Sequence, residues 1–113
     1  MSTYRELTVW QKSIDLVVLV YHFTVRFPPQ EQYGLTSQMR RAAVSIPSNI
    51  AEGSRRRGKD IRQFLIVAFA SGSELETQFE VSKRLEFGDK ILRIKAERLL
   101  DEVMRMLNKM INS

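Results

Sequence analysis

The sequence lacks cysteine entirely and contains only one histidine, His22, among its 113 residues. The absence of cysteine excludes a disulfide framework, a thiol nucleophile and a cysteine-ligated metal. A di-iron helical bundle needs paired Glu-x-x-His ligands, and the residue three positions before His22 is a leucine. We therefore expect neither a metal site nor a cofactor.

Long apolar segments are absent as well. The longest one extends from Leu16 to Tyr21, whereas a membrane-spanning helix needs roughly 20 apolar residues. The N-terminus does not show the basic, apolar and small-residue pattern of a secretory signal. With 43% hydrophobic and 27% charged residues, the composition is typical of a globular protein. We expect one cytoplasmic domain that covers residues 1–113.

The motifs of common enzyme classes are missing too. The segment from Gly53 to Asp60 is not a complete phosphate-binding loop, because Asp60 stands where the Walker motif has serine or threonine. A Ser-His-Asp triad could be composed from the residue types present, but the sequence has no nucleophile elbow between a strand and a helix. We therefore expect that the protein is not an enzyme.

What the sequence does contain is a helical period of apolar residues. They recur at steps of three and four over residues 7–26, 35–53, 59–86 and 90–111. Proline and glycine mark the three joins, at Pro28-Pro29, between Gly53 and Gly58, and at Gly88. Such short joins favour antiparallel neighbours. The pattern predicts an all-α fold, an antiparallel up-down-up-down four-helix bundle.

The first predicted helix carries two apolar stripes on nearly opposite faces. We assign the stripe through Leu7, Trp10 and Ile14 to the core of the bundle. The second stripe is then a predicted oligomer interface, because a large exposed apolar face usually marks a partner surface. The alternative is that the rotation assigned to this helix is wrong. The second stripe consists of Val9, Leu16, Val20, Phe23 and Phe27.

The positive charge is concentrated in one segment. Between Arg40 and Arg62 lie seven of the 18 basic residues and two of the 13 acidic residues, which accounts for the whole net charge of +5. A local excess of this kind is typical of a surface that binds phosphates, although a solvated basic turn would have the same composition. This turn contains no aromatic residue, so we expect phosphate contact without base stacking. The predicted nucleic-acid-binding residues are Arg55, Arg56, Arg57, Lys59 and Arg62.

A second group of polar residues lies near the predicted core. Asn49 falls on an apolar stripe, where a polar residue often fixes the register of packed helices. Two alternatives remain, a polar pocket and, least favoured, a catalytic site. Arg40 and Arg41 point about 100° apart on a helix, so one is expected to pair with a glutamate and the other to face solvent or a neighbouring chain. The group consists of Arg40, Arg41, Ser45, Asn49, Glu52, Glu74 and Glu76.

Several motifs together resemble a known family. They are Val9-Trp10-Gln11-Lys12, Phe27-Pro28, Gln38-x-Arg40-Arg41-Ala42, the block from Ser45 to Gly53, Phe64-Leu65, and Glu74-Leu75-Glu76. In this order they are similar to the bacterial four-helix-bundle proteins encoded in intervening sequences of 23S ribosomal RNA genes. The resemblance implies a ring-shaped homo-oligomer, with a pentamer expected, and association with RNA or the ribosome. It does not imply an enzyme.

The leading hypothesis is a non-enzymatic, oligomeric protein that binds nucleic acid, with RNA and ribosomal RNA in particular expected, through its basic turn. A second hypothesis is a scaffold that binds another protein, for example a reverse transcriptase, because a related branch of the fold assists such enzymes. A third is a small-ligand pocket around Asn49 and Glu52. We expect no membrane partner.

Overall fold

The computed structural model of the chain describes residues 3–56 and 60–113, and these ranges contain four α-helices and two short 3-10 helices. The α-helices are α1 (Thr8–Thr24), α2 (Leu35–Arg55), α3 (Asp60–Arg84) and α4 (Lys90–Ile111), and the 3-10 helices are η1 (Tyr4–Glu6) and η2 (Pro29–Glu31). The predicted all-α four-helix fold is confirmed, and the predicted helix ends lie within about two residues of the observed ones.

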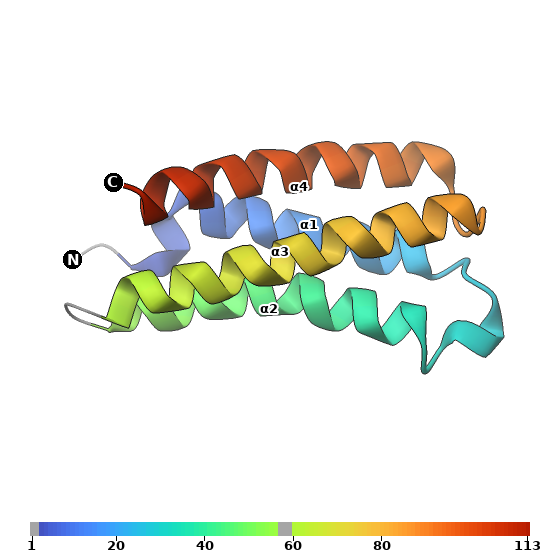
Figure 1. Cartoon of the computed structure of the whole chain (residues 1–113), viewed down its shortest axis with the longest axis horizontal. Coiled ribbons are helices and arrows are strands. Elements are labelled where there is room, and N and C mark those ends of the chain that lie inside the picture. Colours follow the sequence, from blue (N-terminus) through green and yellow to red (C-terminus); the bar gives the residue numbers. More distant parts are fainter. Residues whose placement is uncertain (1–2, 57–59) are drawn as a thin grey trace.

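Successive helices run in opposite directions, as the short joins predict (Figure 1). Each helix packs against two others: α1 contacts α2 and α4, and α3 contacts α2 and α4, with the most extensive contact between α2 and α3. The bundle measures 44 × 24 × 23 Å. Both chain termini lie at the end of the bundle where α2 ends and α3 begins, which brings four segments together there (Figure 1). We call this end the basic end.

The helix ends follow from local chemistry. The carboxylate of Asp89 caps α4, because its Oδ1 accepts hydrogen bonds from the backbone N–H groups of Ile91 at 2.7 Å and Leu92 at 3.0 Å. Gly88, just before it, has φ +78°, a conformation that glycine adopts without strain. At the start of α2, Oε1 of Glu31 accepts a hydrogen bond from the backbone N–H of Leu35 at 3.1 Å.

The predicted rotation of the first helix is wrong. The five residues predicted for the oligomer interface, Val9, Leu16, Val20, Phe23 and Phe27, are all buried in the core of the chain itself. Phe23 packs on Phe79 of α3, with ring centroids 5.7 Å apart. The other stripe, through Trp10, Ile14 and Tyr21, lies only half-buried or exposed.

The stripe that forms the core also contains a polar residue, Ser13. It interrupts the stripe that forms the core, and a serine in a core position argues against burial. Yet Ser13 is fully buried, because its hydroxyl donates a hydrogen bond to the carbonyl of Trp10 at 2.7 Å. A hydroxyl whose bond is made within its own helix costs little to bury, so Ser13 does not divert the helix from packing its large aromatic residues inward.

Two glycines permit close contact between helices. Gly53 was expected to end the second helix, but α2 continues to Arg55, and a Cβ at Gly53 would lie 2.9 Å from the Cβ of Phe64 on α3. Gly72 of α3 faces Met104 of α4 so closely that an added Cβ would overlap the thioether. Within residues 3–56 and 60–113, every helix is too short or too polar to cross a membrane.

Candidate functional site

The basic end contains the predicted nucleic-acid-binding turn. Arg55 is the last residue of α2, and Arg62 lies in the first turn of α3. Arg55, Arg56 and Arg62 are all exposed. Arg57 and Lys59 lie outside the described residues.

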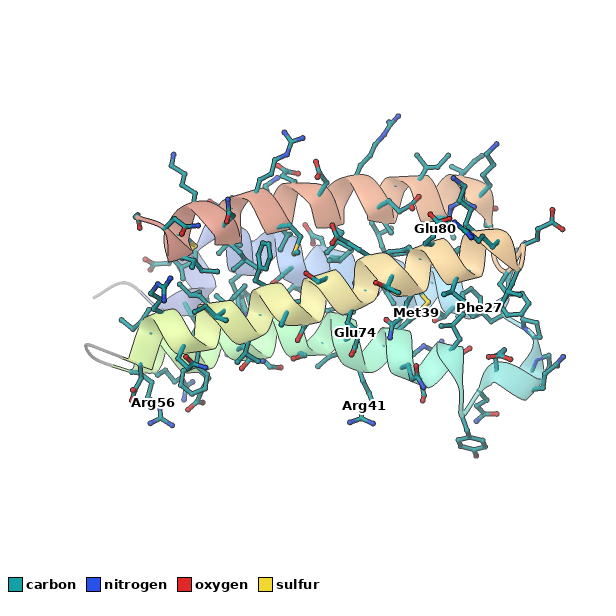
Figure 2. The ribbon with its side chains drawn as sticks, viewed as in Figure 1. Phe27, Met39, Arg41, Arg56, Glu74 and Glu80 are labelled. Atoms are coloured by element: carbon teal, nitrogen blue, oxygen red, sulfur yellow. The ribbon has the colours of Figure 1, made fainter. Side chains whose placement is uncertain are left out.

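Arg56 is already engaged with carboxylates. Its Nη2 lies 3.1 Å from Oε1 of Glu52, and its Nη1 lies 4.0 Å from Oδ2 of Asp60. Its guanidinium also lies over the ring of Phe64, 5.3 Å from the centroid. The side chain projects from the α2 side of the bundle (Figure 2). Because its charge is compensated locally, Arg56 contributes less to anion binding than the sequence predicts.

Arg62 and Arg55 bind no carboxylate among the described residues. Nε of Arg62 donates a hydrogen bond to the backbone carbonyl of Ile111 at 3.1 Å, where α4 ends. A cation at this position satisfies a carbonyl that the helix leaves unpaired. The guanidinium of Arg55 lies 5.3 Å from the ring centroid of Tyr4. Both arginines therefore keep a net positive charge at the basic end.

Tyr4 is a functional candidate that the sequence interpretation missed. It belongs to η1, which packs against both α1 and α2. The guanidinium of Arg5 lies 5.6 Å from the same ring that Arg55 approaches, and Trp10 meets it edge-on with centroids 5.2 Å apart. Hydrogen bonding from Arg55 and the charges of both arginines lower the pKa of the Tyr4 phenol below its ordinary value. An aromatic ring thus lies beside the basic turn, although none lies within it.

A cavity of about 370 Å³ that is open to solvent adjoins this ring. It lies between the N-terminal segment and the end of α2. Its lining combines a guanidinium, an aromatic ring, an aliphatic side chain and two hydroxyl-bearing residues: Thr3, Tyr4, Leu7, Ser54 and Arg55. We call it the Tyr4 cavity.

The predicted polar group only partly comes together. Ser45 lies at its centre: its hydroxyl is 2.8 Å from the hydroxyl of Ser71 on α3. Nδ2 of Asn49 donates hydrogen bonds to the carbonyl of Ser45 at 2.8 Å and to its hydroxyl at 3.0 Å. Asn49 is half-buried, and both of these hydrogen bonds lie within α2.

An open groove of about 470 Å³ lies between α2 and α3 beside Ser45. We call it the α2–α3 groove. Arg41 and Glu74 belong to it, both with exposed side chains, and Arg41 projects outward past α2 (Figure 2). The residues that line it are Gln38, Arg41, Ala42, Ser45, Ser71 and Glu74.

The neighbouring arginines diverge as predicted, but the partner of Arg40 is not a glutamate. Nε of Arg40 donates a hydrogen bond to Oγ1 of Thr24 at 2.9 Å, and its guanidinium lies 4.5 Å from the ring centroid of Tyr21. Both partners are on α1, so Arg40 joins α2 to α1.

Two predicted members lie elsewhere. Glu52 pairs with Arg56 at the basic end. Glu76 lines a separate groove between α3 and α4, together with Glu97 and Asp101. The predicted pocket around Asn49 and Glu52 therefore does not form as one site. Among residues 3–56 and 60–113, no group of three or more histidine, cysteine, aspartate or glutamate side chains is arranged to hold a metal ion.

The chain matches the model of the 23S rRNA-intervening sequence protein family over residues 5–109. It belongs to this family. A solved structure from Bacteroides thetaiotaomicron, described as a protein of unknown function from the S23 ribosomal protein family, has the same fold with a TM-score of 0.83 and 24% sequence identity. The similarity covers 94% of this chain and 100% of that one. No curated protein matches the chain.

Proposed function

We propose that this protein is a non-enzymatic, cytoplasmic RNA-binding protein that acts as a homo-oligomer and contacts phosphates through its basic end. The observation that carries the proposal is the concentration of uncompensated charge there. Arg55 and Arg62 lie at the junction of α2 and α3 and have no carboxylate partner among the described residues. Membership of the 23S rRNA-intervening sequence protein family makes ribosomal RNA the first RNA to test.

The proposed mechanism is electrostatic. A protein that neutralises phosphates releases condensed counterions, so its affinity falls as salt rises, with a slope of about −0.7 in log affinity per phosphate on a single strand. If each chain contacts about three phosphates, the slope is about −2 per engaged chain. Several chains of an oligomer that engage one RNA would steepen it and raise the affinity through multivalency.

The test is fluorescence anisotropy of labelled RNA, a 23S rRNA fragment and an unrelated RNA, titrated with protein at several salt concentrations. The variant Arg55→Gln/Arg62→Gln should weaken binding to both RNAs and make the slope shallower by about 1.4 per engaged chain, because each chain loses two phosphate contacts. The matched control is Arg98→Gln. Arg98 is also exposed and has no carboxylate partner among the described residues, but it lies about 20 Å along α4 from the basic end. Equal affinities and slopes for all three proteins would refute the proposal.

Homo-oligomerisation has separate support on α1. Val18, Tyr21 and Val25 are 48%, 40% and 68% exposed, and their spacing places them on one face of the helix. Tyr21 and Val44 of α2 border an open groove of about 570 Å³. An apolar face of this kind suits a second copy of the chain better than solvent.

The family resemblance makes a pentameric ring the expected assembly. Light scattering after size exclusion should give a multiple of 13.2 kDa. Val25→Glu should lower this mass while leaving helicity unchanged, because the side chain is largely exposed in the single chain. A monomer at micromolar concentration would contradict this part of the proposal.

The α2–α3 groove supports a second candidate, a protein-binding scaffold. Arg41 and Glu74 present opposite charges along it, and neither has an ion-pair partner among the described residues. Exposed charges of both signs provide the specificity that a protein partner needs. Arg41→Ala/Glu74→Ala should then abolish capture of a partner, such as a reverse transcriptase, without changing RNA affinity.

A further inference from the structure

The Tyr4 cavity and the side chains around the Tyr4 ring have features that phosphate contact alone does not explain. Arg55, which lines the cavity, and Arg5, which lies beside it, both place a guanidinium within 6 Å of the Tyr4 ring. Neither has a carboxylate partner among the described residues. Two positive charges beside one ring repel each other unless an anion lies between or beside them. This arrangement favours an anionic ligand.

The remaining lining has a different character. Leu7 and the Tyr4 ring provide apolar and aromatic surface, and Thr3 and Ser54 add hydroxyl-bearing side chains. The volume of about 370 Å³ falls within the range of roughly 300–1,000 Å³ that is usual for small-ligand sites. A free phosphate would leave the aromatic and aliphatic surface unused. A ligand with both an anionic group and a flat, weakly polar group would use all of it.

We infer that the Tyr4 cavity binds one unpaired nucleotide of an RNA strand, with its base against the Tyr4 ring and its phosphate on the guanidiniums of Arg5 and Arg55. This inference rests on the proposed RNA binding and specifies the form of RNA that is bound. Bases stack on aromatic side chains and on arginine guanidiniums when a strand is single. In an A-form duplex the faces of the bases are already stacked on one another, so a duplex cannot fill this site.

The two arginines also indicate how a base would enter. Both guanidiniums already lie near the ring that the base would contact. A base that stacks on Tyr4 replaces one of them, and the displaced guanidinium is then close to the phosphate of the same nucleotide. A charge-assisted hydrogen bond to phosphate replaces the weaker cation–π contact.

The experiment compares single-stranded oligouridine with a duplex of the same length, each fluorescently labelled, for the wild type and three variants. Tyr4→Leu removes the aromatic ring and keeps an apolar side chain. It should weaken single-strand binding about tenfold, in the range found for loss of one base–aromatic stack. Duplex binding and the salt slope of both RNAs should be unchanged, because no charge is lost. Tyr4→Phe should bind like the wild type.

Tyr33→Leu is the matched control. Tyr33 is 89% exposed and lies in the join before α2, at the end of the bundle opposite the basic end. This variant should bind both RNAs like the wild type. A second measurement needs no variant: Trp10, the single tryptophan of the chain, meets the Tyr4 ring edge-on. Oligouridine, but not the duplex, should change its fluorescence in a saturable way.

The outcomes distinguish the nucleotide site from the more general proposal that the basic end binds RNA. If Tyr4→Leu binds single strands as the wild type does, or loses single-strand and duplex binding equally, the nucleotide site is refuted. An effect of Arg55→Gln/Arg62→Gln on the salt slope would still support RNA binding by the basic end in that case. If the fluorescence of Trp10 does not change when oligouridine is added, the inference is also refuted. If the wild type binds no RNA at all, both proposals fall.

Discussion

Glu86 is a position where a glycine should stabilise the protein. It has φ +58°, and it is the one non-glycine residue with positive φ among residues 3–56 and 60–113. The backbone N–H of Glu86 donates to the carbonyl of Lys83 at 3.1 Å, and that of Phe87 donates to the carbonyl of Ser82 at 2.9 Å. These two hydrogen bonds form a Schellman motif that ends α3. The residue in its left-handed position is usually glycine, because a Cβ there is strained.

The magnitude of Glu86→Gly follows from two opposing effects. Relief of the left-handed strain stabilises the folded chain by about 1–2 kcal/mol. The greater freedom of glycine in the unfolded chain opposes this by about 0.5–1 kcal/mol. The side chain of Glu86 is exposed and forms no ion pair with a described residue, so nothing else is lost. The net gain should be about 0.5–1 kcal/mol, or roughly 2–4 °C in Tm for a domain of this size.

Thermal unfolding by circular dichroism checks this at one fixed protein concentration, because Tm depends on concentration if the chain assembles. The control is Glu86→Ala, which removes the charge and keeps the Cβ. Its Tm should stay within about 1 °C of the wild type, a shift well below that of the glycine variant. If Glu86→Ala raises Tm as much as Glu86→Gly does, the gain comes from the charge, and the argument from backbone strain is refuted.

Three further substitutions should have the following effects. Gly88→Ala should destabilise the fold by about 2–4 kcal/mol in urea unfolding, because it adds left-handed strain and places a Cβ against the rings of Phe23 and Phe27; an unchanged midpoint would contradict the packing of this turn. Phe23→Ala should lower the free energy of unfolding by about 3–5 kcal/mol. If this variant loses its oligomeric mass, its helicity should fall as well, because Phe23 is buried within the single chain. Asn49→Leu should cost about 1 kcal/mol, because its hydrogen bonds to Ser45 are lost at a half-buried site; a rise in Tm would show that these hydrogen bonds do not stabilise the fold.

The number, order and direction of the helices could be predicted from the sequence because apolar periodicity and turn residues are local signals. The rotation of α1 could not, because both of its faces are apolar and the choice depends on what the other helices present. Phe79 of α3 provides a ring for Phe23, and this match exists only in the assembled bundle.

The candidate site likewise contains contacts between residues that are close in sequence and contacts between residues on different helices. The pairing of Glu52 with Arg56 is an i,i+4 contact, so helix spacing alone could have predicted that Arg56 is compensated. Arg40 is different, since its partners Thr24 and Tyr21 lie on another helix and are a hydroxyl and a ring rather than the expected carboxylate.

The aromatic ring beside the basic turn shows why composition can mislead about the type of nucleic-acid contact. The turn between α2 and α3 contains no aromatic residue, and that fact alone predicts phosphate contact without stacking. The antiparallel course of four helices, however, returns the start of α1 to the same end as the close of α2 (Figure 1). Tyr4 thereby approaches Arg55 across 51 positions of sequence. In an up-down bundle each end is built from segments far apart in the chain, so a surface at one end must be interpreted from all of them together.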